Sequence, residues 1–299
     1  MQLLITGIEW LYDTQRWKCT LQGYGDTIYQ LELKPQQMIE WQIQSGRACI
    51  GSIIYRKSSS TQTFTKIWKP CPDNASPMQG KRCLPCAQAT ELYPCIRCNG
   101  SICRADPQRQ QTCSTQTSYV YLASFGPKLL KVGVAHHSRI PKRWIEQGAN
   151  VATRLLETNG RKARRYETFI HDTFNVRSQV PTQYKFDTLW KFMTQQETAA
   201  ISTLVDEIQR QAPNLPFYQD TIHDLTASYG LPLFAHRPLL IAVAPHQLVT
   251  GMILGVKGSI LVLQVHGIPH ILNLRQLIGR SIMISEGGTT VVQRVLDEF

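Results

Sequence analysis

Two closely spaced cysteine pairs constrain the fold of this chain more than any other feature of its sequence. Cys83-Leu-Pro-Cys86 and Cys95-Ile-Arg-Cys98 are CxxC pairs with eight residues between them. A CxxC turn directs two thiolates toward one point, and two such turns complete the tetrahedral four-sulfur site that zinc prefers. The surrounding residues 71–113 lack an apolar period long enough to build a core. A structural zinc ion would therefore supply most of the folding energy of this segment.

The segment contains more cysteines than one tetrahedral site needs. The seven candidate zinc ligands are Cys71, Cys83, Cys86, Cys95, Cys98, Cys103 and Cys113. One allocation makes a single site from the two CxxC pairs. A second allocation joins Cys71, Cys83 and Cys86 to a missing fourth ligand, and makes another site from the last four cysteines. The alternative to metal is a set of free, buried thiols, and the sequence leaves the allocations open.

The remaining two cysteines, Cys19 and Cys49, lie far from this segment and are predicted to be small core residues. We expect a cytoplasmic protein without a membrane span. No basic residue precedes Glu9, which interrupts the apolar run that a secretory leader needs. The most apolar stretch, residues 248–265, contains Lys257 and divides into strand-length pieces. In a reducing compartment, clustered cysteines bind metal more often than they form disulfides.

Positive charge is concentrated in one part of the chain. The net charge is +11, and the stretch from Lys128 to Arg165 holds ten basic residues and two acidic ones. Such an excess predicts a phosphate-binding surface for a nucleic acid, DNA or RNA. The predicted contacts are Lys128, Lys142, Arg161, Lys162, Arg164 and Arg165. The alternative is a solvated face of a basic protein.

Local patterns divide the chain into four predicted segments of an α+β protein. Residues 1–70 contain short runs of strand composition and form an N-terminal β-segment. Residues 71–117 are the cysteine-rich, zinc-binding segment. Residues 118–212 alternate strands and helices, and residues 213–299 are typical of a small β-domain with glycine-rich turns.

The C-terminal segment has two interpretations. Lys257, Arg275 and Arg280 could line a binding face like that of an oligonucleotide-binding barrel. Alternatively, the segment is a β-module that packs against the N-terminal strands. The sequence leaves both interpretations open.

Residues 118–212 predict a hairpin across Gly126-Pro127, followed by a short helix from Pro141, a third strand and two longer helices. The second long helix, residues 194–211, begins with Thr194 and Glu197 at the spacing of a capping box.

A carboxylate occupies the apolar face of the first long helix, residues 163–176. Glu167 lies on the same face as Ile170. Such a carboxylate is costly unless a cation, a metal or hydrogen-bond donors satisfy it. The alternative is a glutamate at the edge of the face that reaches water or pairs with Arg143 or Arg164.

Four short motifs of this region resemble the GIY-YIG nuclease superfamily. They are Tyr119-Val-Tyr121, Lys131-Val-Gly133, Lys142-Arg143-Trp144 and Glu167. The longer run from Val120 to Ala149, with Lys131-Val-Gly-Val and Arg139-Ile-Pro-Lys-Arg143-Trp-Ile-Glu-Gln-Gly, is similar to a bacterial and archaeal family, the domain of unknown function 2797. Members of that family also carry CxxC pairs just upstream.

The resemblance implies roles for five residues. Tyr121 matches the tyrosine of the first motif. Arg143, with Arg139 as its rival, matches the arginine that contacts the scissile phosphate. Glu167 matches the glutamate that binds Mg²⁺ or Mn²⁺. Lys131 replaces the tyrosine that activates the attacking water, so it could serve there only with a depressed pKa, and otherwise it holds a phosphate.

Three functions remain open from the sequence. The first is a nucleic-acid-binding zinc protein that has lost catalysis, and the second is an active Mg²⁺-dependent endonuclease that hydrolyses phosphodiesters. The third is a zinc-stabilised scaffold for protein partners. Lys131 favours the first function over the second, and the basic stretch favours either over the third.

Overall fold

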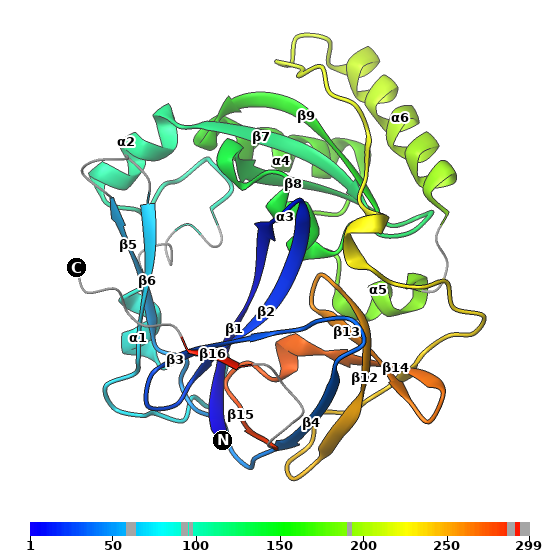
Figure 1. Cartoon of the computed structure of the whole chain (residues 1–299). Helices are drawn as coiled ribbons and strands as arrows, with labels where there is room; N and C mark the ends of the chain where they lie inside the picture. Colours follow the sequence, from blue (N-terminus) through cyan, green and yellow to red (C-terminus); the bar gives the residue numbers. More distant parts are fainter. Residues whose placement is uncertain (58–63, 91–94, 96–97, 190–192, 286–290, 294–299) are drawn as a thin grey trace. The chain divides into compact units, whose positions relative to one another are not determined.

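The computed structural model describes residues 1–299 except 58–63, 91–94, 96–97, 190–192, 286–290 and 294–299 (Figure 1). The chain has a mixed α and β architecture and separates into two compact units. Unit 1 comprises residues 1–96, 239–255 and 259–299. Unit 2 comprises residues 97–238 together with residues 256–258. Within the described residues, no helix is long and apolar enough to cross a membrane.

Unit 1 is built on one large sheet whose strands come from both ends of the chain (Figure 1). In spatial order the strands are β11 (Leu239–Leu240), β14 (Ile268–Asn273), β13 (Ile260–Val265), β12 (Leu248–Lys257), β4 (Met38–Ile43), β15 (Ser281–Ile284), β1 (Gln2–Asp13), β2 (Arg16–Tyr24), β3 (Ile28–Glu32) and β16 (Val291–Gln293). β11 and β14 are parallel. The pairs β14–β13, β12–β4, β4–β15, β15–β1, β1–β2, β2–β3 and β3–β16 are antiparallel. Pairings between segments far apart in the sequence therefore hold this sheet together.

Strand β4 shows how this sheet is specified. Its buried residues Ile39, Trp41 and Ile43 alternate with polar or exposed ones. This period of two places one face toward the core and leaves the other toward solvent. The strand pairs with β12 on one side and β15 on the other, through Val249–Trp41 and Ile282–Ile43.

The C-terminal strands thus pair with the N-terminal strands, as one of the two interpretations predicts. The predicted segments 1–70 and 213–299 are therefore not two separate domains, because strands of both lie in one sheet. The alternation of buried and exposed residues determines which face of a strand is buried, but not which strand it pairs with.

A second, two-stranded element of unit 1 leads into the cysteine-rich segment. Strand β5 (Ser52–Lys57) pairs with β6 (Phe64–Lys69), with Ser52 opposite Lys69. The short helix α1 (Leu84–Gln88) follows, with Cys83 immediately before it and Pro85 in its first turn. Proline is tolerated there because its missing N–H would have no partner inside the helix.

Unit 2 holds a four-stranded sheet with the order β10 (His223–Asp224), β9 (Val151–Asn159), β7 (Thr117–Ser124) and β8 (Leu130–His136). Its helices are α2 (Pro107–Thr115), α3 (Lys142–Gln147), α4 (Gly160–Phe174), α5 (Thr182–Thr188) and α6 (Thr194–Gln211). The 3₁₀ turns are η2 (His137–Arg139) and η3 (Thr226–Tyr229), and η4 (Leu274–Gln276) lies in unit 1.

Helices α4 and α6 share one core with the sheet of unit 2. Ile170 of α4 and Ile201 of α6 are fully buried beside Val120 of β7. Asn159 caps α4 by accepting a hydrogen bond from the Lys162 N–H, so the helix begins earlier than its apolar pattern predicts. The hairpin, the short helix and the two long helices match the sequence prediction for residues 118–212.

Candidate metal centre and charged cluster

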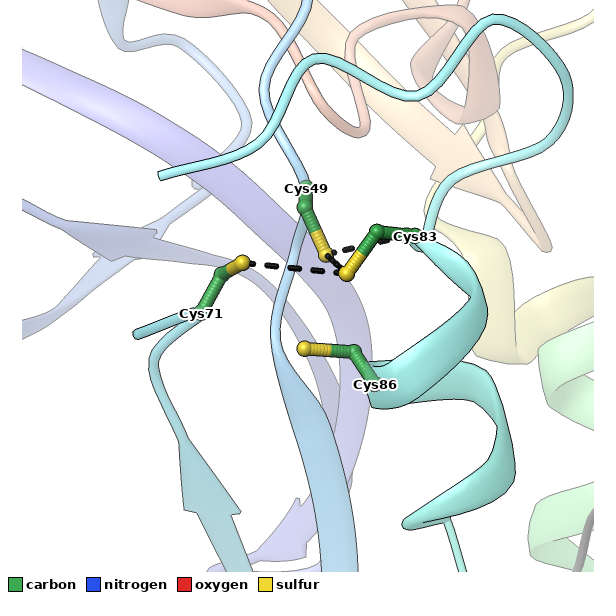
Figure 2. Close-up of side chains that lie close together, drawn as sticks. All are labelled: Cys49, Cys71, Cys83 and Cys86. Atoms are coloured by element: carbon green, nitrogen blue, oxygen red, sulfur yellow. Dashed lines mark hydrogen bonds between the residues drawn. The ribbon is translucent and has the colours of Figure 1, made fainter. Parts of the chain in front are cut away.

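Four cysteine sulfurs meet in unit 1 and form the candidate metal centre (Figure 2). The Sγ atoms of Cys49, Cys71, Cys83 and Cys86 all lie within 4.8 Å of one another. The Sγ atom of Cys83 is 3.6 Å from that of Cys49 and 3.8 Å from that of Cys71. A zinc tetrahedron with Zn–S bonds of about 2.3 Å has sulfur–sulfur edges of about 3.8 Å. The four thiols are therefore already spaced for a tetrahedral ion, and none is in a disulfide.

Local backbone bonds place these sulfurs. The Cys49 N–H donates to the Ala75 carbonyl at 2.7 Å, which joins the loop after β4 to the segment after Cys71. The Cys83 N–H donates to the Cys49 sulfur at 3.2 Å. Cys83 and Cys86 lie before and within the first turn of α1, so both thiols point to the same side. Three separate segments converge on the centre.

Metal binding at this centre would release protons from the thiols. Burial works to raise the pKa of Cys71, but hydrogen bonds with the N–H groups of Ala75 and Asp73 and with the Cys49 and Cys86 thiols together outweigh it and bring the pKa to about 7. Burial raises the pKa of Cys49 and that of Cys86 above the ordinary range. A buried group of four thiolates needs a divalent cation to offset its charge, and soft sulfur donors suit zinc. The centre could therefore hold a structural metal such as zinc.

The fourth ligand position belongs to Cys49. The expectation that Cys49 lies apart from the cysteine segment as a simple core residue is wrong. Sequence spacing could not reveal it, because Cys49 precedes the β5–β6 hairpin and meets Cys71 only after the hairpin folds back. Cys19 is buried in the sheet at 3% exposure, as a small core residue should be.

The remaining candidate ligands do not join this centre. They are Cys95, Cys98, Cys103 and Cys113. In the part of the chain that the structure describes, no group of three or more metal-ligand side chains includes any of them. Cys98 instead accepts a hydrogen bond at its sulfur from the Gly100 N–H, and Cys113 packs in α2 against Gly160.

A charged cluster gathers in unit 2 from four elements. It consists of Tyr121 on β7, Lys131 on β8, Arg143 on α3 and Glu167 on α4. Burial raises the pKa of Glu167, and the charges of Lys131 and Arg143 oppose that rise, together with those of Arg164 and His171. The structure thus brings together four of the five residues to which the family resemblance assigns roles.

Tyr121 is the buried and uncharged member of this charged cluster. Its side chain is 1% exposed, and its hydroxyl accepts a hydrogen bond from the Gln147 amide at 2.7 Å. Burial raises the pKa of Tyr121, which keeps the phenol neutral. Such a hydroxyl holds α3 in place rather than reaching solvent. Sequence reasoning did not single out Gln147.

The position of the Tyr121 ring requires a residue without a side chain at position 133. The two residues face each other across β7 and β8. A Cβ atom on Gly133 would lie 2.5 Å from the Tyr121 hydroxyl oxygen, so the ring fills the space that a side chain would need. The glycine of the Lys131-Val-Gly133 motif therefore has a packing reason.

Of the two rival arginines, Arg143 is the one that acts on Glu167. Arg139 is paired elsewhere, because its guanidinium lies 2.6 Å from the Glu146 carboxylate. Arg143 lies 3.7 Å from the same carboxylate and is 42% exposed. Arg143 can therefore reach both Glu146 and solvent.

Three predicted phosphate contacts donate hydrogen bonds to the turn at residues 98–101, and two of them, Arg161 and Arg165, are also exposed. Arg164 donates to the Cys98 carbonyl at 3.2 Å, and Arg165 donates to the Gly100 carbonyl at 3.0 Å. Arg161 donates to the carbonyls of Gly100 and Ser101, both at 3.2 Å. The basic stretch thus serves partly to order this turn. Lys128 and Lys162 are exposed, and Lys142 is half-buried.

Arg154 is also committed to a structural pair. Its guanidinium donates to both carboxylate oxygens of Asp220 at 2.8 Å, and Asp220 is 5% exposed. Burial works against ionisation of Asp220, but the bonds from Arg154 outweigh it and hold the pKa of Asp220 well below its ordinary value. His223 lies 3.1 Å from the same carboxylate.

A second carboxylate, Glu197, lies in a buried network rather than in a capping box. It is fully buried and accepts hydrogen bonds from Ser124 at 2.6 Å and from Asn150 at 2.8 Å. Lys257, at 4% exposure, bonds to Asn150 and belongs to the same unit. Burial lowers the pKa of Lys257 to about 8, and the charge of Glu197 opposes this. Lys257 is therefore not part of an exposed binding face.

Comparison with known proteins confirms the predicted resemblance to one family. No curated protein and no solved structure matches the chain. The model of one family, described as a protein of unknown function (DUF2797), matches residues 42–282 and spans the metal centre and the charged cluster. Since that match covers well over half of the chain, the protein belongs to the DUF2797 family.

Proposed function

We propose that this protein binds nucleic acid through unit 2 and that a structural zinc ion stabilises unit 1. The observation that carries the proposal is that the positive charges of Lys131 and Arg143 both act on the Glu167 carboxyl group. A guanidinium offers a phosphate two parallel donors, and a neighbouring ammonium adds a point charge. Lys128 and Lys162, both exposed, supply further positive charge in the same unit.

The zinc part rests on the four-sulfur geometry. Cys49, Cys71, Cys83 and Cys86 would hold the ion, and the ion would tie three segments together without taking part in chemistry. Closed four-cysteine sites leave no open position for a substrate, which supports a structural role.

A GIY-YIG-like organisation of residues 118–212 is part of the proposal. The order β8–β7–β9 with the carboxylate on the following helix α4 supports it. Three residues would then have the roles that the resemblance implies, with Tyr121 inside the core, Arg143 toward phosphate and Glu167 beside it.

The runner-up function is a Mg²⁺-dependent endonuclease. Glu167 would bind Mg²⁺ or Mn²⁺, and the ion would stabilise charge on the phosphate. Within the described residues, Glu167 belongs to no group of three or more metal-ligand side chains. Water and substrate phosphates would have to complete its coordination, which Mg²⁺ accepts. The cations beside Glu167 compete with such an ion, so a binding role is favoured. A protein-interaction scaffold remains the third candidate.

A salt titration tests nucleic-acid binding. Affinity for labelled duplex DNA and RNA should be measured by fluorescence anisotropy over a range of KCl concentrations. The slope of log K against log salt is negative, and each lost phosphate contact should reduce its magnitude by about 0.9 for duplex DNA. Arg143→Gln should lose one such contact, whereas Arg210→Gln, an exposed change on α6, should not. A protein that binds neither DNA nor RNA at low salt would leave the scaffold function standing.

A further inference from the structure

A lysine, an asparagine and a glutamate meet in the interior of unit 2. The Lys257 Nζ atom donates a hydrogen bond to the Oδ1 atom of Asn150, which lies 107 positions away in the chain. The Nδ2 atom of the same amide donates to both carboxylate oxygens of Glu197, at 2.8 and 3.1 Å. The Asn150 amide therefore has an amine at its carbonyl oxygen and a carboxylate at its nitrogen.

The backbone brings Lys257 and Asn150 together. The turn that carries Lys257 approaches the end of α3 so closely that a Cβ atom on Gly258 would lie 2.7 Å from the Gly148 nitrogen. Two residues further on, the Asn150 N–H donates to the Ser124 carbonyl at 2.8 Å. Main-chain contacts thus hold the amine and the amide in place, which lowers the entropic cost of a reaction between them.

These three side chains are shielded from water. Asn150 and Glu197 are fully buried, and Lys257 is 4% exposed. The ring of Tyr229, itself 3% exposed, lies 5.8 Å from the Lys257 Nζ atom. Burial lowers the pKa of Lys257 to about 8, so its neutral, nucleophilic form is easier to reach than that of a lysine in water. The alternative is an ion pair bridged by an amide, in which no bond changes.

We propose that Lys257 and Asn150 join through an amide bond between their side chains, with Glu197 as the carrier of protons. The Lys257 ammonium first gives one proton to the Glu197 carboxylate. The neutral Nζ atom then attacks the Asn150 Cγ atom, so that the Nζ–Cγ bond forms and the Cγ–Nδ2 bond breaks. A second Nζ proton passes through the Glu197 carboxyl group to Nδ2, which leaves as ammonia. The products are a secondary amide, one ammonia and an uncharged Glu197, and no oxidant or cofactor is consumed.

The positions of the groups fit these steps. The Glu197 carboxylate contacts Nδ2, which is the atom that needs a proton in order to leave. The Ser124 hydroxyl donates to the same carboxylate at 2.6 Å and orients it. An amine attacks an amide very slowly in water, but reacting groups held in contact reach effective concentrations of about 10⁵–10⁸ M. Until the bond forms, Lys257 and Glu197 remain opposite charges, so substitutions that remove one charge act on this open chain.

Mass spectrometry of the full-length protein tests the inference. The denatured wild type should be lighter than its sequence mass by one ammonia. A tryptic digest should contain a branched peptide in which Lys257 is joined to Asn150, without cleavage after Lys257. The branched peptide is needed as well as the mass, because an asparagine before a glycine, such as Asn159, can lose the same ammonia by cyclising.

Three variants test the roles of the residues. Lys257→Met should have its full sequence mass, because the attacking amine is gone. Glu197→Gln keeps a similar shape but cannot carry protons in this way, so it should also contain no branched peptide. Lys128→Met, the matched control, removes an exposed lysine from the same unit and should contain the branched peptide. Circular dichroism on each preparation identifies any variant that does not fold.

The wild-type measurement decides the inference by itself, so a variant that fails to fold does not affect it. Wild-type protein without the branched peptide, even after prolonged incubation at a pH above the pKa of Lys257, overturns the bond. A branched peptide in folded Glu197→Gln overturns the role of Glu197 as the carrier of protons. None of these outcomes depends on nucleic-acid binding, so this inference and the proposed function stand or fall separately.

Discussion

The Sγ atoms of Cys49 and Cys83 lie 3.6 Å apart although 34 positions separate the two residues along the chain. The backbone N–H of Cys83 also donates to the Cys49 sulfur. This contact makes Cys49 the fourth corner of the metal centre and joins the loop after β4 to the start of α1.

Cys49→Ser should remove zinc from the protein. A serine hydroxyl is a poor zinc ligand beside three thiolates, so the content should fall well below the roughly one zinc per chain expected of the wild type. Elemental analysis of protein purified without added metal checks this. Cys19→Ala changes an equally buried cysteine outside the centre and should retain the metal. Cys98→Ser should retain it too. A Cys49→Ser protein with full zinc content would contradict the four-cysteine site.

Glu167→Gln separates a binding protein from a nuclease. If Glu167 is a structural partner of Lys131 and Arg143, the change should cost about 1–3 kcal/mol of folding free energy. Nucleic-acid binding should hold or tighten, because a negative charge near phosphate is removed.

Denaturant unfolding and cleavage assays with Mg²⁺ and Mn²⁺ should be run on one preparation. Asp206→Asn, an exposed carboxylate on α6 outside the charged cluster, is the control and should change stability by less than about 0.5 kcal/mol. Cleavage by the wild type that falls by orders of magnitude in Glu167→Gln would establish the nuclease instead.

Asp220→Asn should destabilise the protein at neutral pH and matter less in acid. The pKa of Asp220 is lower in the folded protein than its unfolded value of about 3.9. Its contribution is therefore complete above that value and is lost as the pH falls toward the folded pKa. We expect a loss of about 3 kcal/mol near pH 7 that shrinks steadily below pH ~4.

Urea unfolding of wild type and Asp220→Asn at several pH values measures this difference. Asp172→Asn changes a carboxylate that is 68% exposed and should show little effect at any pH. A wild-type-to-mutant difference that stays constant from neutral to acidic pH would refute the Arg154–Asp220 account.

Lys257→Met should leave the buried Glu197 without its opposing charge. Removing one of two opposite charges from a buried network costs up to about 3–5 kcal/mol. The double change Glu197→Gln/Lys257→Met should recover most of that loss, because glutamine can still bond to Ser124 and Asn150 without a charge. Lys128→Met, an exposed change in the same unit, is the control. Equal stability of Lys257→Met and the double variant, measured in urea, would show that charge is not the cause.

Periodic local signals predicted unit 2 well. The hairpin, the short helix, the third strand and the two long helices of residues 118–212 were predicted, whereas α5 (Thr182–Thr188) was not. Glu167 was singled out because it lies on the apolar face of its helix. The family match over residues 42–282 agrees with motifs that could be read directly. These elements are local, so a single sequence contains their signal.

Contacts between residues far apart in the sequence could not be predicted from local patterns. Cys49 joins the centre only through chain reversal, and no spacing rule links it to Cys71. Thr194 and Glu197 match a capping box, yet Met193 precedes the helix and the Glu197 carboxylate bonds to Ser124 and Asn150. Arg161, Arg164 and Arg165 bond to a turn that the sequence placed in a zinc site. In each case the residue type was recognised, and its partner was decided by tertiary structure.

The position of β4 has a consequence for synthesis on the ribosome. Its neighbours β12 and β15 begin at Leu248 and Ser281, so β4 must wait for most of the chain to be translated. At 5–20 residues per second this delay is on the order of 10–50 s. The four cysteines of the candidate metal centre are all translated by Cys86, long before those strands. Early zinc loading could therefore protect the nascent N-terminal segment while it waits for its partner strands.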